Sequence, residues 1–581
     1  MFVKETRVRR GERTYTYLQL VEGYRDEQGR VRMRVVANLG RKEKLKDSGE
    51  LDRLAASLAR HDPPVAGARR EVGPLLLVCH YLDRLGLVAL VDRHLPQRGR
   101  AQLTTGEVVA ALACNRLCAP APLYDVAGWG SGAALQELLG IPGMLLNDDR
   151  LGRALEVFAP VAEEVRGAAC LAALERFGAA AGRLHLDLTT LRVAGAYEGS
   201  ALVAKGWGPE GVARQVRVLE AVDGEGIPLY VRPEPGDAAE LSLVGAGLER
   251  LASLLPPGLL VCCDSVLGHV KNLCAAERAG LRFICPLRAD TGFAERFLAE
   301  VGHEGLRRLD YVARRERRLP PARRTRYRGA LRPFEVADPE PGEPRRFRVA
   351  YIWSSEEARS VAGGRERALA KAEEALARVE RGLGGHHYKT KKQVDARVAI
   401  VVAPVKGLLE VTTGTRGGKP TLRWCRNEQA IEKAAAADGL YALATNLPGR
   451  LSAGALLRTY KEQGLVERRH RDLKGPLRVR PIFLHNDDRI AALVSIVGLA
   501  LLVFGLIEAD LRRALGPEQE LPGLLPEGRA GRPTGRSLLA AFQGLGLTHT
   551  RDGIVLDRLT GTQRQILELL GVPIPWPEQP R

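Results

Sequence analysis

The chain has 581 residues, more than one ordinary domain holds, and we expect three or four folding units. Hydrophobic residues make up 45% of it and charged residues 27%, which argues against wholesale disorder. The net charge of +18 at pH 7 favours a polyanionic partner, although a solvated basic surface would give the same value. The nine cysteines include no pair of Cys-x-x-Cys motifs, which argues against a structural zinc site and favours reduced thiols in the cytoplasm.

The first forty residues predict a β-hairpin. Segments with strand character at 15–21 and 31–37 flank a turn at 26–29, and arginines punctuate both strands. A basic ribbon of this kind fits a DNA contact, and it fits an ordinary small β-subdomain equally well. We place the N-terminal β-hairpin subdomain at 1–60.

Residues 61–180 are expected to form an all-α domain. Apolar residues recur at helical spacing in 74–87, 105–117 and 150–177. No pattern of catalytic residues stands out in this part, so we expect it to bind DNA or support assembly.

From residue 183 the pattern changes to strands and helices in alternation. Two helices are expected at 238–255 and 267–279, and five short strands at 184–188, 216–221, 228–232, 259–263 and 282–287. Three strands in meander order, then helix, strand, helix and strand, come close to the element order of the ribonuclease H-like fold. We therefore expect a multidomain α/β protein whose mixed-sheet, ribonuclease H-like core has its first part at 181–304.

An insertion is expected to split this core. Residues 314–332 hold nine arginines and one glutamate, and 355–381 predicts a long charged helix. Strands are expected near 396–402, 408–413 and 421–425, and we assign 305–437 to the insertion. The core then resumes over 438–520, with a strand at 440–445 and a helix N-cap at Ser452. A linker and a C-terminal helical tail fill 521–581.

One long apolar run, from Ile490 to Ile507, has the length of a membrane helix. A helix buried on all sides in a large core has the same composition. We favour burial and expect no membrane association, because a single late span is unusual in a basic chain. A membrane-anchored protein is the alternative.

Two aspartates end buried strands that should be neighbours in one sheet. Asp187 and Asp264 would lie at the carboxyl edge, where open α/β sheets place their sites. Carboxylates held this close repel each other unless a divalent cation compensates, and hard oxygen ligands suit Mg²⁺ or Mn²⁺. The alternative is that each aspartate only caps a strand end.

A third acid lies on a charged helix. Glu467, Arg471 and Lys474 fall at i, i+4 and i+7, on one helix face. A carboxylate with two cations on its face can bind metal while the cations hold phosphate. An exposed helix with internal salt bridges has the same pattern, and Glu462 and Asp472 are rival acids.

Tyr460, Glu467 and Lys474 also have the spacing of a known motif. The chain resembles bacterial insertion-sequence transposases of the DDE class, in the insertion sequence four superfamily. That group carries Tyr, two residues, Arg, three residues, Glu, six residues and Lys, and here Gln463 stands where the family has Arg. The closest subgroup is the sixteen-thirty-four type, which is similar in the segments 16–40, 145–156, 438–448 and 480–494.

The resemblance implies a transposase that binds the ends of an insertion sequence, cleaves a strand and transfers it into target DNA. Asp187, Asp264 and Glu467 would be the catalytic metal ligands for two Mg²⁺ or Mn²⁺ ions. Tyr460 and Lys474 would contact DNA, and we place Gln463 and Arg471 in the same set. We expect a homodimer on double-stranded DNA, in the cytoplasm with the nucleoid. The alternative is a catalytically inactive, transposase-derived DNA-binding protein.

Overall fold

The computed structural model describes residues 2–10, 13–25, 31–48, 50, 67–96, 101–179, 182–195, 197–208, 211–254, 258–339, 343–462, 464–475, 477, 484–516 and 519–579. The chain divides into two compact units. The first combines Met1–Val161 with Asp510–Arg581, and the second is Ala162–Ala509. We describe each by itself.

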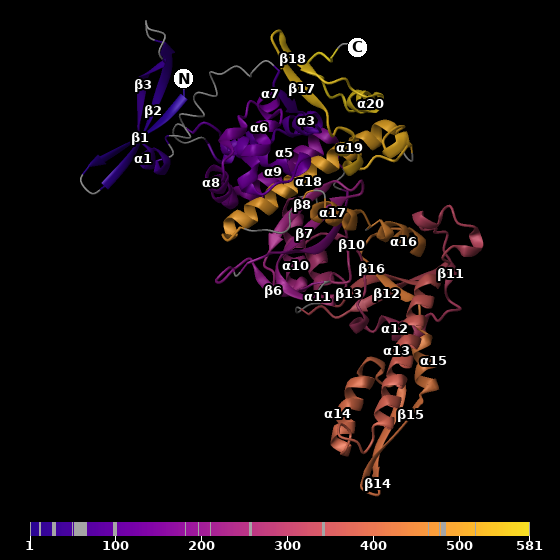
Figure 1. The fold of residues 1–581 in the computed structure, drawn as a ribbon. Coiled ribbons are helices and arrows are strands. Elements are labelled where there is room, and N and C mark those ends of the chain that lie inside the picture. Colours follow the sequence, from indigo (N-terminus) through magenta and orange to yellow (C-terminus); the bar gives the residue numbers. More distant parts are fainter. Residues whose placement is uncertain are drawn as a thin grey trace. The chain divides into compact units, whose positions relative to one another are not determined.

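The first unit begins with a small antiparallel sheet (Figure 1). Its strands are β1 (Phe2–Arg10), β2 (Arg13–Arg25) and β3 (Val31–Arg41), and α1 (Lys42–Asp47) follows them. The predicted hairpin corresponds to β2 and β3, whose predicted turn at 26–29 lies outside the described residues. The prediction missed β1, because its alternating Val, Arg and Thr residues are too polar to stand out as a strand.

The rest of the first unit is mainly helical. The expectation of an all-α domain at 61–180 missed the strand at Arg69–Glu71, and the helix Ala162–Phe177 of that range belongs to the second unit. The elements in this part of the first unit are β4 (Arg69–Glu71), α3 (Leu75–Leu85), α4 (Leu87–His94), α5 (Thr105–Cys118), α6 (Val126–Gly132), α7 (Leu135–Leu139), α8 (Asp148–Phe158), α19 (Gly535–Ala541), β17 (Gly546–Thr550), β18 (Gly553–Leu556) and α20 (Gly561–Leu570). The C-terminal tail was predicted to be helical only. It also supplies β17, which pairs with β4 and β18 in one sheet, so the tail completes this unit.

The second unit is built on one mixed sheet of ten strands. The strands are β5 (Arg183–Arg192), β6 (Ala204–Gly208), β7 (Gly211–Asp223), β8 (Pro228–Glu234), β9 (Leu260–Cys263), β10 (Arg282–Pro286), β11 (Arg307–Arg308), β12 (Tyr327–Val336), β13 (Arg345–Ser354) and β16 (Leu440–Thr445). Its helices are α9 (Ala162–Phe177), α10 (Glu240–Leu254), α11 (Val270–Arg278), α12 (Phe293–Glu300), α13 (Ser355–Arg381), α14 (Lys391–Val402), α15 (Glu428–Ala435), α16 (Ala453–Lys461), α17 (Gly464–Lys474) and most of α18 (Asp487–Leu515).

The strand order places the predicted strands next to one another. β8 pairs with β7 and β7 with β5, both antiparallel, and β5, β9 and β10 then run parallel. β16 joins β10 antiparallel and leads on through β13, β12 and β11. The sheet is therefore mixed, and strands far apart in sequence meet at its centre.

Helices cover both faces of the sheet around β7 and β8. On one face, Gly247 of α10 lies against the Leu219 side chain, and a Cβ there would meet it at 2.3 Å. On the other face, Gly498 of α18 lies against Val231, and Gly505 against Pro228. Figure 1 shows α17 and α18 on this second side, with α10 on the first. The missing side chains at these glycines allow the close approach of α18.

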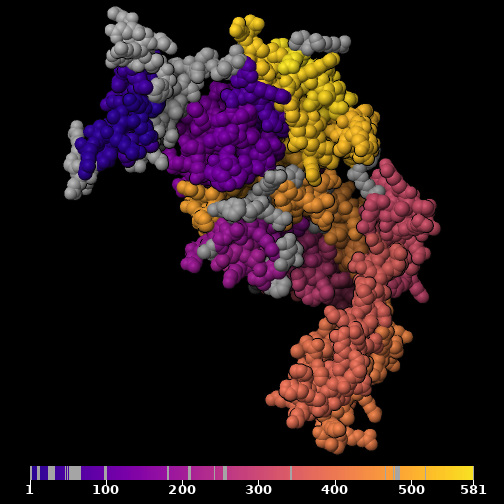
Figure 2. Space-filling view, in the orientation of Figure 1, coloured from indigo at the N-terminus to yellow at the C-terminus, as the bar shows by residue number. Residues whose placement is uncertain are grey.

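The predicted insertion begins too early at residue 305. β11, β12 and β13 belong to the main sheet, because they extend it beyond β16. Residues 355–437 have a hydrophobic core of their own, formed by α13, α14 and the hairpin of β14 (Leu409–Arg416) and β15 (Lys419–Arg426). This lobe appears in orange shades in the space-filling view (Figure 2).

The strand predicted at 396–402 is wrong, since these residues are the C-terminal part of α14. Thr390 and Gln393 form a capping box that starts this helix. Val394 and Val398 are buried four residues apart, which is helical spacing. The run of Val, Ala and Ile after Asp395 has strand composition, but the cap and the lobe's core decide the local structure.

The apolar run from Ile490 to Ile507 lies within α18. This helix passes a length and composition test for a membrane span, but 94% of its most apolar window is buried within the protein. Val497, Leu501 and Phe504 are each at most 1% exposed. The prediction of an interior helix is therefore confirmed.

Candidate active site

Two aspartates lie side by side at the sheet's centre. β5 and β9 pair in parallel up to Leu186 and Cys263, and the next residue on each strand is an aspartate, Asp187 and Asp264. The Asp264 carboxylate accepts a hydrogen bond from the Val266 N–H at 3.0 Å. The parallel register thus brings together the first two acids that the sequence singled out.

The electrostatics of Asp187 show which other acids are near. Burial raises its pKa to about 7, against a hydrogen bond from the Leu188 N–H that favours the charged form. The negative charges of Asp264, Glu467 and Glu240 add to this rise in pKa. The pKa of Asp264 is also raised, mainly by burial. Acids from three separate segments therefore surround Asp187, and their mutual repulsion disfavours its ionised form.

Glu467 reaches this place on α17, which packs against β5 and β7. Its side chain is exposed in the first turn of the helix. Glu462 belongs to the end of α16 and forms a 2.6 Å ion pair with Arg183. α16 ends at Lys461 and α17 begins at Gly464, so the two glutamates belong to different helices.

The residues expected to contact DNA differ in their surroundings. Tyr460 is half-buried on α16 and packs against the core below β10, β13 and β16. Burial raises its pKa, and the charge of Asp264 adds to that rise, so its hydroxyl lies near the acids. Arg471 is exposed and Lys474 is half-buried on α17. Gln463 lies outside the described residues.

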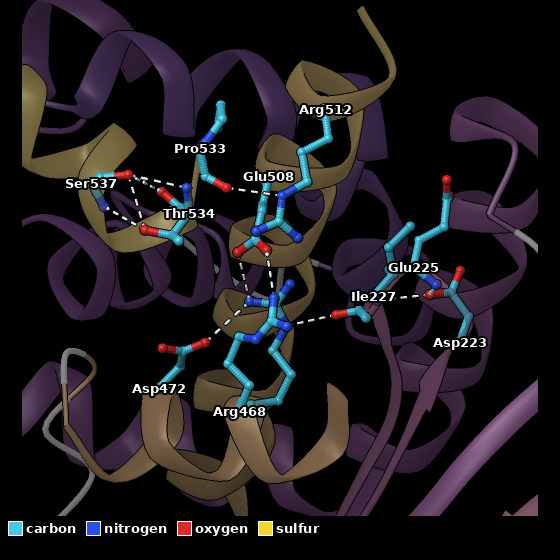
Figure 3. Close-up of polar contacts among 12 residues, drawn as sticks. Asp223, Glu225, Ile227, Arg468, Asp472, Glu508, Arg512, Pro533, Thr534 and Ser537 are labelled. Atoms are coloured by element: carbon cyan, nitrogen blue, oxygen red, sulfur yellow. Dashed lines mark hydrogen bonds and ion pairs between the residues drawn. The ribbon is translucent and has the colours of Figure 1, made fainter. Parts of the chain in front are cut away.

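α17 is anchored by a buried arginine that the sequence analysis overlooked. Arg469 is 1% exposed and donates hydrogen bonds to the Gly226 carbonyl at 2.6 Å, to Asp472 at 3.1 Å and to Glu508 at 3.0 Å. Figure 3 shows Asp472 and Glu508 on either side of this network, with Asp223 and Ile227 of the neighbouring turn. The network ties α17 to α18 and to the turn between β7 and β8, which fixes the orientation of the Glu467 helix. The rival acid Asp472 belongs to this network as a hydrogen-bond partner of Arg469.

Two further residues lie beside Asp187 and were also missed. Glu220 on β7 is the direct register partner of Asp187 and is fully buried. His470 on α17 lies between the two acids, with Nδ1 3.6 Å from Asp187 and Nε2 3.3 Å from Glu220. A signal was available for Glu220, because it is the one charged residue in the otherwise apolar run Val218–Val222.

Two more charged residues lie on the rim of the site. Glu240 begins α10 and pairs with Arg217 at 3.3 Å, and its charge raises the pKa of both aspartates. Arg288 follows β10 and is exposed, and its charge lowers the pKa of Asp264. Neither belongs to a spacing pattern that a single sequence could reveal.

The donor set has the chemistry of a divalent metal site. Asp187, Asp264 and Glu467 offer carboxylate oxygens, and a cation would relieve the repulsion that raises the pKa of Asp187. Within the part of the chain that the structure describes, however, no three His, Cys, Asp or Glu side chains lie close enough to hold one ion. The charges of Asp264 and Glu467 nevertheless act on Asp187, so the three acids are within electrostatic reach.

Two family models match the N-terminal part of the chain. Residues 3–68 match the IS1634 family transposase, N-terminal domain, and residues 68–164 match a domain of unknown function, DUF4277. No curated protein matches the chain. These matches support a transposase of the IS1634 type, in which the second domain also occurs. The resemblance found in 16–40 and 145–156 is thereby confirmed.

Proposed function

We propose that this transposase is a DDE enzyme that binds the ends of its insertion sequence and performs metal-dependent strand cleavage and transfer. The observation that supports it is electrostatic: burial raises the pKa of Asp187 on β5, and the charges of Asp264, which follows β9, and of Glu467 on α17 add to this rise. Perturbed acids gathered at strand ends are typical of catalytic sites.

The sheet supports the same proposal. The order β8, β7, β5, β9, β10, with three antiparallel strands followed by two parallel ones, is the arrangement expected of a ribonuclease H-like core. Residues 355–437 then form an insertion between Asp264 and Glu467, folded around their own core.

Each group has a distinct role in this proposal. Asp187 and Asp264 are rigid ligands on the sheet, whereas Glu467 is exposed on a helix and completes the site when the ions and DNA bind. Two Mg²⁺ or Mn²⁺ ions, when bound, supply activation of the attacking oxygen and stabilisation of the leaving oxygen. Arg471 and Lys474 on the same helix hold the phosphates, and Tyr460 orients the DNA strand beside Asp264.

The partner in this proposal is double-stranded DNA, both element ends and target, bound by two copies of the chain. The 355–437 lobe adds to the basic surface, since Lys389, Lys392, Arg397, Lys406 and Arg423 are all exposed on it. Positive charge of this kind neutralises backbone phosphates without reading sequence.

The test compares two glutamates of similar chemistry. Glu467→Gln keeps the shape of the side chain but removes the charge that would hold an ion. We expect it to abolish cleavage and joining of a labelled, end-containing duplex in Mg²⁺ or Mn²⁺, while binding of that duplex is nearly unchanged.

Glu462→Gln is the matched control, because Glu462 pairs with Arg183 and belongs to α16. It should retain most of the cleavage. A Glu467→Gln variant that still cuts would contradict the assignment, and a wild-type chain that binds the duplex without cutting it would indicate an inactive descendant of such an enzyme.

A further inference from the structure

A buried histidine lies directly beneath the Asp187 carboxylate. His470 is on the inner face of α17, and its side chain is 11% exposed. Nδ1 lies 3.6 Å from the nearer Asp187 oxygen, and Nε2 lies 3.3 Å from a Glu220 oxygen. The imidazole therefore bridges an acid that faces the site and an acid that is fully enclosed.

Glu220 has little else to contact. As the register partner of Asp187, it points to the same face of the sheet, and it is 0% exposed. Within the described residues, neither of its carboxyl oxygens has a hydrogen-bond partner, and neither has His470 Nε2. A buried polar group without a partner is costly, so these groups favour a small rotation that lets Nε2 and the carboxyl bond to each other.

Both groups are enclosed by the fold, since Glu220 is 0% exposed and the His470 side chain is 11% exposed. Only one ring nitrogen of a neutral imidazole carries a proton, so the contact of Nε2 with Glu220 decides whether Nδ1 can donate to Asp187.

We propose that His470 is a positioning residue that holds the Asp187 carboxylate, and that Glu220 holds His470. The inference rests on the proposed function, because the orientation of Asp187 matters only if that carboxylate acts in catalysis. Polar contacts made from behind a metal ligand fix its orientation, and their loss typically alters metal affinity or activity 10- to 100-fold.

The helix itself links this support to the third acid. Glu467 and His470 are three residues apart on α17, so a single helical turn carries both. Arg469, between them in sequence, fixes the rotation of that turn through Glu508 and the Gly226 carbonyl. His470 thereby sets the position of α17 relative to Asp187 as well as the carboxylate's orientation.

The experiment uses the full chain and two substitutions of His470. His470→Leu fills much of the same volume without a polar atom, and His470→Asn places an amide nitrogen close to the position of Nδ1. Cleavage of the end-containing duplex is measured against Mn²⁺ concentration. Thermal unfolding of the DNA-free protein over the same Mn²⁺ range gives a second readout that does not depend on activity.

We expect His470→Leu to raise the Mn²⁺ concentration for half-maximal effect by about tenfold or more in both readouts. His470→Asn should recover most of this shift. Glu220→Leu, which removes the acid beside Nε2, should raise the Mn²⁺ midpoint in the same direction as His470→Leu. Leu473→Ala is the control for a general loss of stability on α17, since Leu473 is fully buried there, and it should leave the Mn²⁺ midpoint unchanged.

The variant Asp187→Asn distinguishes a failure of the positioning role from a failure of the proposed function. If Asp187→Asn is inactive while His470→Leu and His470→Asn both keep the wild-type Mn²⁺ midpoints, the positioning role is wrong and the proposed function stands. If Asp187→Asn cleaves as well as wild type, the proposed function is wrong and this inference falls with it. If the His470→Leu protein fails to fold, His470→Ala is measured in its place, and a wild-type Mn²⁺ midpoint in that variant would overturn the positioning role.

Discussion

Asp187 lies where an ionised carboxyl is unfavourable without a cation. Its folded-state pKa of about 7 exceeds the ordinary value of 3.8, mainly through burial and then through the neighbouring acids. Between these two pH values the folded state binds more protons than the unfolded state, so stability falls as pH rises. The ionised Asp187 carboxyl therefore destabilises the fold at neutral pH.

Asp187→Asn should therefore stabilise the protein in the presence of a chelator. The gain in unfolding free energy should be absent below about pH 4, grow between about pH 4 and 7, and level off above that at about 4 kcal/mol or less. Chemical denaturation at pH 4.5 and 8 measures it. Equal gains at the two pH values would contradict the predicted perturbation, and added Mn²⁺ should reverse the sign by stabilising wild type alone.

At the scale of elements, α17 is held by contacts on its inner face, while Glu467 and Arg471 are exposed. The inner contacts centre on Arg469, whose partners Glu508 and Asp472 are also largely buried. An enclosed ion pair is worth little compared with an apolar core, but losing one member is severe, because the other charge stays buried.

Arg469→Met should therefore destabilise the chain by about 3–5 kcal/mol, because it leaves Glu508 without its closest cation. Arg468→Gln is the matched control, since Arg468 is 30% exposed and lies 3.4 Å from Glu508. It should cost less than about 1 kcal/mol. Urea unfolding of both variants provides the measurement, and similar losses for the two would show that Arg469 does not anchor α17.

α18 contributes to the same core with apolar side chains. Val497→Asp should give an insoluble or unfolded protein, because a charge at a fully buried position has no partner. Ile400→Asp is the control, since Ile400 on α14 is 66% exposed. Soluble expression and circular dichroism report the outcome, and a well-folded Val497→Asp protein would show that the helix has an exposed side.

At the scale of the whole molecule, the net charge is +18, and the basic residues behind it differ in their surroundings. The arginine cluster at 314–332 is partly structural: Arg324 donates to the Leu319 carbonyl, and Arg328 to the His303 and Leu306 carbonyls. Others, including Arg318, Arg323 and Arg326, are exposed. These exposed cations are the part of the cluster that can reach DNA phosphates.

DNA binding should depend strongly on salt. If about six phosphates are neutralised, affinity should fall roughly a thousandfold between about 50 and 200 mM salt. Changing Arg318, Arg323 and Arg326 to Gln should reduce the slope of log affinity against log salt by about 3. Changing Lys389, Lys392 and Lys406 removes the same charge from the 355–437 lobe, and equal slopes for the two triple variants would assign the effect to net charge alone.

Local pattern was enough to predict much of this protein. The helix at 355–381 and the strand at 440–445 have the predicted bounds, the cap at Ser452 is present, and the segment 490–507 is buried. Each of these depends on neighbours in sequence, through spacing of apolar residues or a side-chain cap. The motif of Tyr460, Glu467 and Lys474 likewise lies within two consecutive helices.

What sequence could not decide depends on contacts between distant segments. The insertion boundary was placed 50 residues too early, because only pairing with β16 makes β13, and through it β12 and β11, part of the main sheet. The strand predicted at 396–402 is helical, because the lobe's core buries one face of it. Glu220, His470 and Arg469 gained their roles in the same way, since register and helix packing, which act across the fold, bring them to Asp187 and Glu508.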